Sequence, residues 1–111
     1  MTEELVTLET AKLLKEKGFS QRKYFINVST LHNCYKYLSV PPQSVAQRWL
    51  RETKDLHICI YNTASGYSYE ISKADNGTEV LCMPKGPNDG GKWDTYEEAL
   101  EAGIQEALKL I

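Results

Sequence analysis

The sequence predicts an α+β fold in a single domain over residues 1–111: an antiparallel sheet, two helices packed on one of its faces, and a further helix near the N-terminus. Three observations predict this fold class. Apolar residues recur at helical spacing in three segments, they alternate with polar residues in the segments between, and turn-forming residues separate the two patterns. A chain of this length can bury one core but has no room for a second domain with its own core.

The first predicted helix covers residues 8–17. Thr7 is a suitable N-cap, because its hydroxyl can accept a hydrogen bond from a backbone N–H of the first turn. Gly18 can adopt the left-handed conformation that ends a helix, and this lets Phe19 fold back against the last turn.

A hairpin and a second helix are expected next. Aromatic and β-branched residues over 24–28 and 34–38, separated by a polar turn region at 29–33, predict two antiparallel strands. Pro41 and Pro42 stop the second strand, and proline is tolerated at a helix start, so a helix is expected over 43–54. Its expected buried residues are Val45, Ala46, Trp49 and Leu50.

Beyond Asp55 the hydrophobic period changes from 3.6 to 2, which predicts three consecutive antiparallel strands. The sequence Asp75-Asn76-Gly77 is a strong hairpin signal between the second strand and a third strand around residues 80–82. The strand residues expected in the core are Ile58, Ile60, Tyr69 and Ile71.

The last helix, residues 96–111, is the most clearly specified element. Thr95 is its predicted N-cap, and Glu98 completes a capping box. Gly103 lies at the edge of the apolar stripe, where glycine costs ~1 kcal/mol relative to alanine, so we expect it to permit close packing. The stripe consists of Tyr96, Leu100, Ile104, Ala107, Leu108 and Ile111.

The composition narrows the functional class. The 13 basic and 15 acidic residues give a net charge of −2, which provides no general attraction to nucleic-acid phosphates or anionic lipids. No apolar run approaches the ~20 residues that cross a bilayer, and the acidic N-terminus does not resemble a signal peptide, so the predicted location is the cytoplasm. Cys34, Cys59 and Cys82 are an odd number without Cys-x-x-Cys spacing and are expected to be reduced and buried.

No catalytic residue, metal ligand or cofactor is predicted. His32 and His57 are the only histidines, and neither lies at metal-ligand spacing from a cysteine or carboxylate. No acid–base pair or nucleophile motif accompanies them. The sequence therefore predicts a non-enzymatic protein.

The Gly-rich loop at 84–92 is the candidate site for a small ligand. Backbone N–H groups before a helix bind anions, and Lys85 and Lys92 flank the loop; together with Trp93 they are the candidate ligand-binding residues. The loop matches no established phosphate-binding motif, and the carboxylates that follow it would repel a phosphate. A flexible connector is therefore the alternative interpretation.

Seven tyrosines exceed what so small a core needs, and some are expected on the surface, where tyrosine supports recognition. Packing against the first helix is the alternative. The candidate interaction residues are Tyr24, Tyr35, Tyr37 and Tyr61. An apolar patch on the sheet face opposite the core is expected from Cys59, Tyr61, Leu81 and Met83. Such a patch predicts a two-fold dimer or another protein partner.

The order helix, three strands, helix resembles the double-stranded-RNA-binding fold in element order. That family contacts phosphates with lysines at the start of its last helix, where this chain has Asp94, Glu97 and Glu98. The strands also lack the Arg/Lys stripe that phosphate and base contacts need, so nucleic-acid binding is disfavoured.

Three segments, residues 9–19, 42–52 and 95–103, resemble in matching order a family of small uncharacterised proteins of gut-dwelling bacteria and their phages. Residues 24–38 and 85–92 depart from the family. The resemblance implies a bacterial or phage-encoded cytoplasmic protein with an accessory or anti-defence role, and it implies no activity or cofactor. The predicted function is a non-enzymatic binding or interaction module. The alternative is an oligomeric protein that sequesters a small anionic metabolite or nucleotide.

Overall fold

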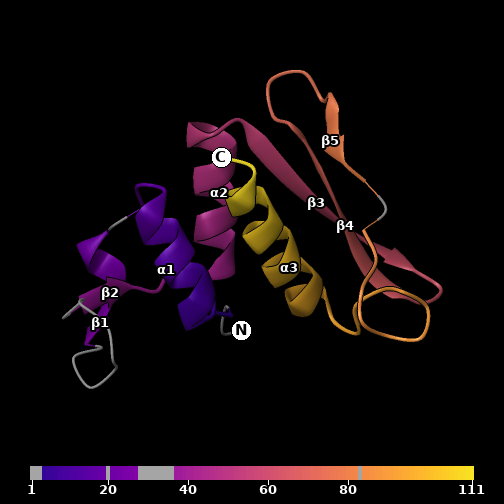
Figure 1. Cartoon of the computed structure of the whole chain (residues 1–111), viewed down its shortest axis with the longest axis horizontal. Helices are drawn as coiled ribbons and strands as arrows, with labels where there is room; N and C mark the ends of the chain where they lie inside the picture. The colour runs from indigo at the N-terminus through magenta and orange to yellow at the C-terminus, as the bar shows by residue number, and fades with distance from the viewer. Residues whose placement is uncertain (1–3, 20, 28–36, 83) are drawn as a thin grey trace.

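The computed structural model describes residues 4–19, 21–27, 37–82 and 84–111. Within these ranges the helices and strands confirm the predicted α+β fold (Figure 1). The elements follow in the order α1 (Leu8–Glu16), the 3₁₀-helix η1 (Arg22–Tyr24), β1 (Phe25–Asn27), β2 (Tyr37–Ser39), α2 (Gln43–Thr53), β3 (Leu56–Thr63), β4 (Gly66–Lys73), β5 (Glu79–Leu81) and α3 (Tyr96–Lys109).

The main sheet is an antiparallel meander in the order β3-β4-β5. Ile58 lies opposite Ile71 between β3 and β4, so both side chains point to the same face. The predicted hairpin turn is present between β4 and β5, where Gly77 has a φ of 75° and the Lys73 N–H donates to the Thr78 carbonyl at 2.7 Å. The strands therefore follow the predicted order.

The N-terminal hairpin is a separate two-stranded sheet. Ile26 of β1 lies opposite Leu38 of β2, which confirms the predicted pairing. This hairpin and the main sheet lie at opposite ends of the molecule (Figure 1). Tyr24, expected in the first strand, ends η1 instead. The predicted turn at 29–33 lies outside the described residues, as do Cys34 and Tyr35.

The two ends of α1 form as its flanking residues predict. The Thr7 hydroxyl accepts a hydrogen bond from the Thr10 N–H at 3.2 Å. At the other end Gly18 has a φ of 108°, its N–H donates to the Lys15 carbonyl at 3.2 Å, and the Phe19 N–H donates to the Leu14 carbonyl at 2.9 Å. This pair of bonds is a Schellman motif, and it places Phe19 in the core.

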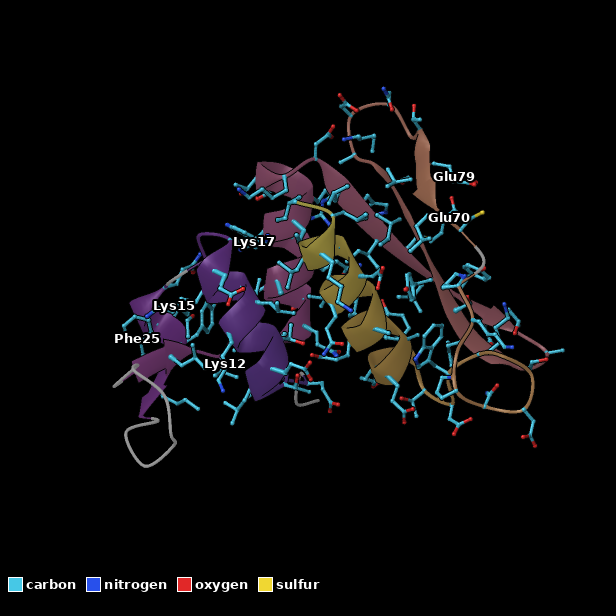
Figure 2. The ribbon with its side chains drawn as sticks, viewed as in Figure 1. Lys12, Lys15, Lys17, Phe25, Glu70 and Glu79 are labelled. Atoms are coloured by element: carbon cyan, nitrogen blue, oxygen red, sulfur yellow. The ribbon has the colours of Figure 1, made fainter. Side chains whose placement is uncertain are left out.

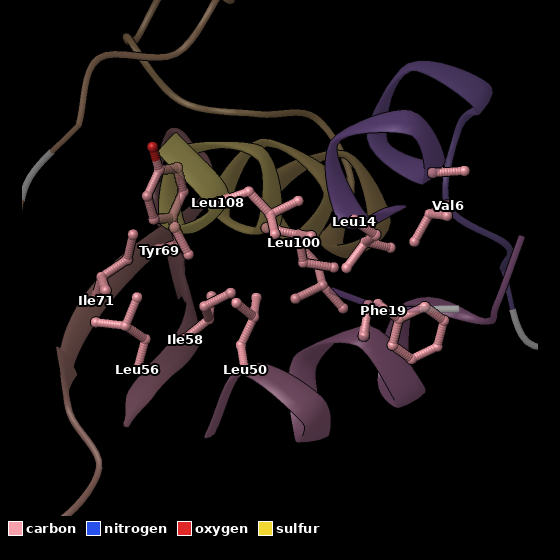
Figure 3. Packing of buried hydrophobic residues seen from close by; sticks show 14 of the residues in the cluster. Val6, Leu14, Phe19, Leu50, Leu56, Ile58, Tyr69, Ile71, Leu100 and Leu108 are labelled. Carbon is pink, nitrogen blue, oxygen red and sulfur yellow. The ribbon is translucent and has the colours of Figure 1, made fainter. Parts of the chain in front are cut away.

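One hydrophobic core joins all three helices to the main sheet. Helices α2 and α3 pack on the same face of β3 and β4, and α1 packs on α3 and β2 (Figure 1). Figure 3 shows Leu50 of α2, Ile58 of β3 and Leu108 of α3 converging between these layers. Of the residues predicted to be in the core, those buried are Ala46, Leu50, Ile58, Tyr69, Ile71, Leu100, Ile104, Ala107 and Leu108. Tyr96 and Ile111, predicted in the apolar stripe, are exposed because they lie at or beyond the ends of α3.

Val45, Trp49 and Ile60 were also expected to be buried, but they are only partly buried at the margin of the core. Helix α2 lies beside the edge strand β3, where the Gln47 side-chain amide donates to the Ile58 carbonyl at 2.7 Å. Its outer flank therefore extends beyond the sheet. The Trp49 ring packs edge-on against Phe19, with centroids 5.5 Å apart.

The first turns of α1 and α2 meet beside the N-terminal half of α3, and all three helices run in roughly the same direction (Figure 1). The segments that lead into α1 and α2 form an antiparallel bridge between Leu5 and Pro42. At the opposite end, the Lys17 ammonium donates to the Ile111 carbonyl at 2.6 Å. Because the three helices run in the same direction, their N-terminal ends, which carry partial positive charge, lie on one side of the molecule.

The carboxylate of Glu101 lies where these helix ends meet. One of its oxygens accepts hydrogen bonds from the Thr7 N–H and the Thr7 hydroxyl, both at 3.1 Å, and from the Thr10 hydroxyl. The other oxygen accepts from the side-chain amide of Gln43 at 3.0 Å. That amide, on the first residue of α2, also donates to the Glu97 carbonyl at 2.9 Å. Glu101 therefore connects α1, α2 and α3.

We expect Glu101→Gln to lower the free energy of unfolding by ~2–3 kcal/mol, because an amide NH₂ would face groups that are themselves donors. Urea unfolding followed by circular dichroism measures the change. Glu97→Gln is the matched control, since that side chain is exposed one turn earlier, and it should change stability by less than ~0.5 kcal/mol. Equal effects of the two changes would contradict the role of Glu101.

The position of Gly103 at the edge of the apolar stripe predicts close packing, and the structure shows that α3 approaches the sheet closely at this residue. A Cβ atom at this residue would lie 2.9 Å from Ile58 Cγ2 and 3.2 Å from Tyr69 Cγ. Gly103→Ala should therefore destabilise the fold by ~1–3 kcal/mol, although alanine is the better helix former. Thermal unfolding measures the effect, and a raised melting temperature would show that no tight contact exists.

Candidate functional site

The face of the main sheet turned away from the helices is the candidate functional surface, and we call it the open face. Within the described residues no helix lies over it (Figure 1). Alternation along the strands places three neighbouring pairs there, because directly opposed residues share a face. The pairs are His57 with Ser72, Cys59 with Glu70, and Tyr61 with Ser68.

The predicted apolar patch does not form as expected, because Leu81 lies on the helix-covered face. Leu81 is opposite Ile71 and packs against the core. A β-bulge between Ile71 and Ser72 causes the difference: Glu79 is opposite Ser72, and Val80 is the extra residue. Simple alternation cannot account for this shift. Met83 lies outside the described residues, so only Cys59 and Tyr61 of the expected patch are on the open face.

The open face is acidic where apolar residues were expected. Glu70 and Glu79 lie on neighbouring strands β4 and β5, close to each other (Figure 2). A hydrogen bond to Glu79, partial burial, and the charges of Glu79 and Glu70 raise the pKa of the Cys82 thiol. In the part of the chain that the structure describes, neither carboxylate forms an ion pair with lysine or arginine.

Two polar atoms on this face are buried without a hydrogen-bond partner among the described residues. They are the Ser68 hydroxyl and Nδ1 of His57. Ser68 has no exposed surface. A buried polar group without a partner costs roughly 1–3 kcal/mol, so both atoms retain unused capacity for hydrogen bonding.

The Gly-rich loop before α3 is a folded unit organised by Asn88. The Asn88 amide donates to the Ser65 carbonyl at 3.0 Å and to the Asp94 carboxylate at 3.1 Å, and it accepts from the Lys92 N–H at 2.8 Å. The Gly86 N–H donates to the Gly91 carbonyl at 2.6 Å. The backbone N–H groups of Gly86, Asn88, Gly91 and Lys92 therefore donate within the loop and are not free to bind an anion. These bonds favour a folded unit over a flexible connector.

Trp93, predicted to bind a ligand, joins the loop to the sheet. Its backbone forms an antiparallel bridge with Tyr67 through two hydrogen bonds of 2.7 and 2.9 Å. Its indole packs against the Tyr69 ring, with centroids 5.2 Å apart. Lys85 is exposed and Lys92 is partly buried. These contacts give Trp93 a structural role. The described contacts of Lys85, Lys92 and Trp93 do not form a ligand-binding arrangement.

The predicted interaction tyrosines do not form one surface. The Tyr24 ring stacks on Phe19, with centroids 6.5 Å apart, and the Lys23 ammonium lies 5.6 Å from its centre. Tyr61 lies on the open face at the other end of the molecule. Tyr37 belongs to β2, and Tyr35 lies outside the described residues. Of the four, Tyr61 is the one that the structure places on the open face.

Sequence reasoning missed Glu70, Glu79 and Ser68. The signal for Glu70 and Ser68 was available, because both alternate with the core residues Tyr69 and Ile71. This signal was not used, because simple alternation in the third strand placed Leu81 and Met83 on the same face and so predicted an apolar surface there.

Over the described ranges no helix is both long and apolar enough to cross a bilayer. In the same ranges no three or more His, Cys, Asp or Glu side chains gather as a metal site. The chain matches no protein-family model, no curated protein sequence and no solved structure.

The position of Glu79 can be tested through the thiol of Cys82. Glu79→Gln removes the carboxylate whose hydrogen bond is the largest cause of the raised thiol pKa, while burial and Glu70 remain. More thiolate should therefore be present at pH 8, and alkylation by iodoacetamide should be faster. The measurement uses protein with Cys34→Ser and Cys59→Ser, so that one thiol reacts. Glu52→Gln on α2 is the control and should leave the rate unchanged. An unchanged alkylation rate in Glu79→Gln would show that Glu79 does not interact with the Cys82 thiol.

The raised pKa of Tyr69 makes the free energy of unfolding depend on pH in the alkaline range. Burial, followed by the negative charge of Glu106, raises its pKa to about 12, whereas an unfolded tyrosine titrates near ~10. The folded state holds the proton where the unfolded state has lost it, so stability should fall as the pH rises from about 10 to about 12.

Tyr69→Phe should remove this part of the pH dependence, and urea unfolding at several pH values measures it. Tyr96→Phe is the control, because that ring is exposed on α3, and it should retain the slope of the parent protein. Identical slopes for the parent protein and Tyr69→Phe would contradict the assignment.

Proposed function

We propose that this chain is a small non-enzymatic interaction module, and that the open face binds a partner protein. One observation carries the proposal: the sheet has a helix-covered face that forms the core, and an open face with exposed Cys59, partly exposed Tyr61 and two carboxylates that form no ion pair with the other described residues. Tyrosine is enriched at protein interfaces, and carboxylates without ion-pair partners give the surface electrostatic complementarity to a positively charged partner.

The charge of the open face favours a foreign partner over a second copy of the chain. A two-fold dimer through this face would bring Glu70 and Glu79 of one copy close to the same residues of the other. Like charges at such an interface cost free energy when they lose water. A partner that carries positive charge on its contact surface avoids this cost.

The alternative function, sequestration of a small anion, has less support. It would use Lys85 and Lys92, but the backbone N–H groups of Gly86, Asn88, Gly91 and Lys92 already donate within their loop. The open face itself is acidic and would repel an anion. A protein partner therefore accounts for more of the surface.

The resemblance of three segments to proteins of gut-dwelling bacteria and their phages supplies the proposed setting. The module would act in the cytoplasm of a bacterium, or in a host cell in which a phage expresses it. An accessory or anti-defence role fits such a setting, because binding to a partner protein can act without catalysis.

Photo-crosslinking tests the proposed function. A benzoylphenylalanine at position 61 reports on the open face, and the same group at position 48 reports on the outer surface of α2, where Arg48 is exposed. In the native host we expect one discrete crosslinked protein from position 61 and none from position 48. Equal crosslinking from both positions, or none from position 61, would contradict the proposal. A product of two identical chains would establish the dimer instead.

A further inference from the structure

Within the part of the chain that the structure describes, the open face combines two features: carboxylates that form no ion pair, and buried polar groups that have no hydrogen-bond partner. Glu70 lies on the same face as Ser68, two residues along β4, and Tyr61 lies directly opposite Ser68 on β3. Residues two apart on a strand are ~7 Å apart, and directly opposed residues are ~5 Å apart, so these three side chains surround a single point on the sheet.

These groups fit the chemistry of arginine. The Glu70 carboxylate accepts hydrogen bonds, and the unpartnered Ser68 hydroxyl has free acceptor capacity. A guanidinium offers several donors in one plane, pairs with a carboxylate through two of them, and stacks on an aromatic ring such as that of Tyr61. An ammonium is a compact point charge and uses fewer of these features. Glu79 adds further negative charge from β5.

We propose that the open face binds a segment of its partner through an arginine side chain, whose guanidinium lies between the Glu70 carboxylate, the Ser68 hydroxyl and the Tyr61 ring. This inference rests on the proposed function and names the chemistry of the partner. Ser68 is fully buried in the free protein. A neighbouring side chain must therefore change rotamer on binding, and Tyr61, partly exposed and directly opposite, is placed to do so.

Three octapeptides test the proposal: four repeats of Thr-Arg, of Thr-Lys and of Thr-Glu. Each is titrated into ¹⁵N-labelled full-length protein at low salt, and amide shifts are followed by NMR. We expect saturable shifts at Tyr61, Ser68 and Glu70 with the arginine peptide, weaker binding of the lysine peptide, and none of the glutamate peptide.

Glu70→Gln should weaken binding of the arginine peptide by about tenfold, as loss of a charge-assisted hydrogen bond implies. Glu106→Gln is the control, because Glu106 lies on α3 beside Lys109. It should leave the dissociation constant unchanged.

Ser68→Ala separates binding from folding. Among the described residues the Ser68 hydroxyl has no hydrogen-bond partner, so its removal should leave stability unchanged or raise it while weakening binding of the arginine peptide. Ser39→Ala is the matched control. Ser39 is also buried, but its hydroxyl donates to the Gln21 carbonyl at 3.2 Å, so this change should lower stability and leave binding unchanged.

Three results would overturn the inference: equal binding of the arginine and glutamate peptides, shifts confined to residues outside the open face, or no saturable binding. Self-association that is lost in Glu70→Gln would identify a second copy as the occupant and would also overturn it. If position 61 crosslinks a partner while the arginine peptide does not bind, the inference fails and the proposed function stands. If position 61 crosslinks nothing, the proposed function itself fails.

Discussion

The arrangement of the molecule depends on one carboxylate. Glu101 accepts hydrogen bonds from the first turn of α1 and from the first residue of α2, although these groups are far from it in sequence. The start of a helix carries partial positive charge and N–H groups without intrahelical partners, so two helix ends that meet require a nearby acceptor. The partly buried carboxylate of Glu101 fixes where α1 and α2 begin relative to α3.

This constraint determines which surface of the sheet stays free. With α1 bonded to α3, and α3 packed closely on β3 and β4 through Gly103, all three helices lie on one side of the sheet. The helix-covered face is filled by apolar side chains. The other face carries the polar and acidic residues of the same strands, and this one-sided arrangement is the basis of the proposed interaction surface.

The sequence predicts features that depend on local chemistry and misses those that depend on distant contacts. The Thr7 and Thr95 caps, the Gly18 helix end and the Gly77 turn each rest on a few adjacent residues, and all are present. The bulge beside Ile71 depends on the register between two strands. The bonds of Glu101 to α1 and of Asn88 to Ser65 join segments that local patterns cannot bring together.

The candidate site was predicted less well than the fold for the same reason. Tyr61 was placed on the correct face, because alternation in β3 is regular. Leu81 was placed on the wrong face, because β5 contains a bulge at Val80 that shifts its alternation, and the acidic character of the surface was missed as a result. The sequence analysis assigned Trp93 to a ligand-binding loop. It could not predict the bridge of Trp93 to Tyr67, because this contact joins residues far apart in the sequence.

The central claim is that the helices cover one face of the sheet and leave the other face open to solvent. Paramagnetic relaxation by a soluble gadolinium chelate tests it most directly, with side-chain signals of Tyr61 compared with those of Ile58 and Ile71. We expect strong relaxation of the Tyr61 ring signals and protection of the isoleucine methyl groups. Protection of Tyr61 equal to that of the isoleucines would contradict the account, because another part of the chain or a second copy would then cover the open face.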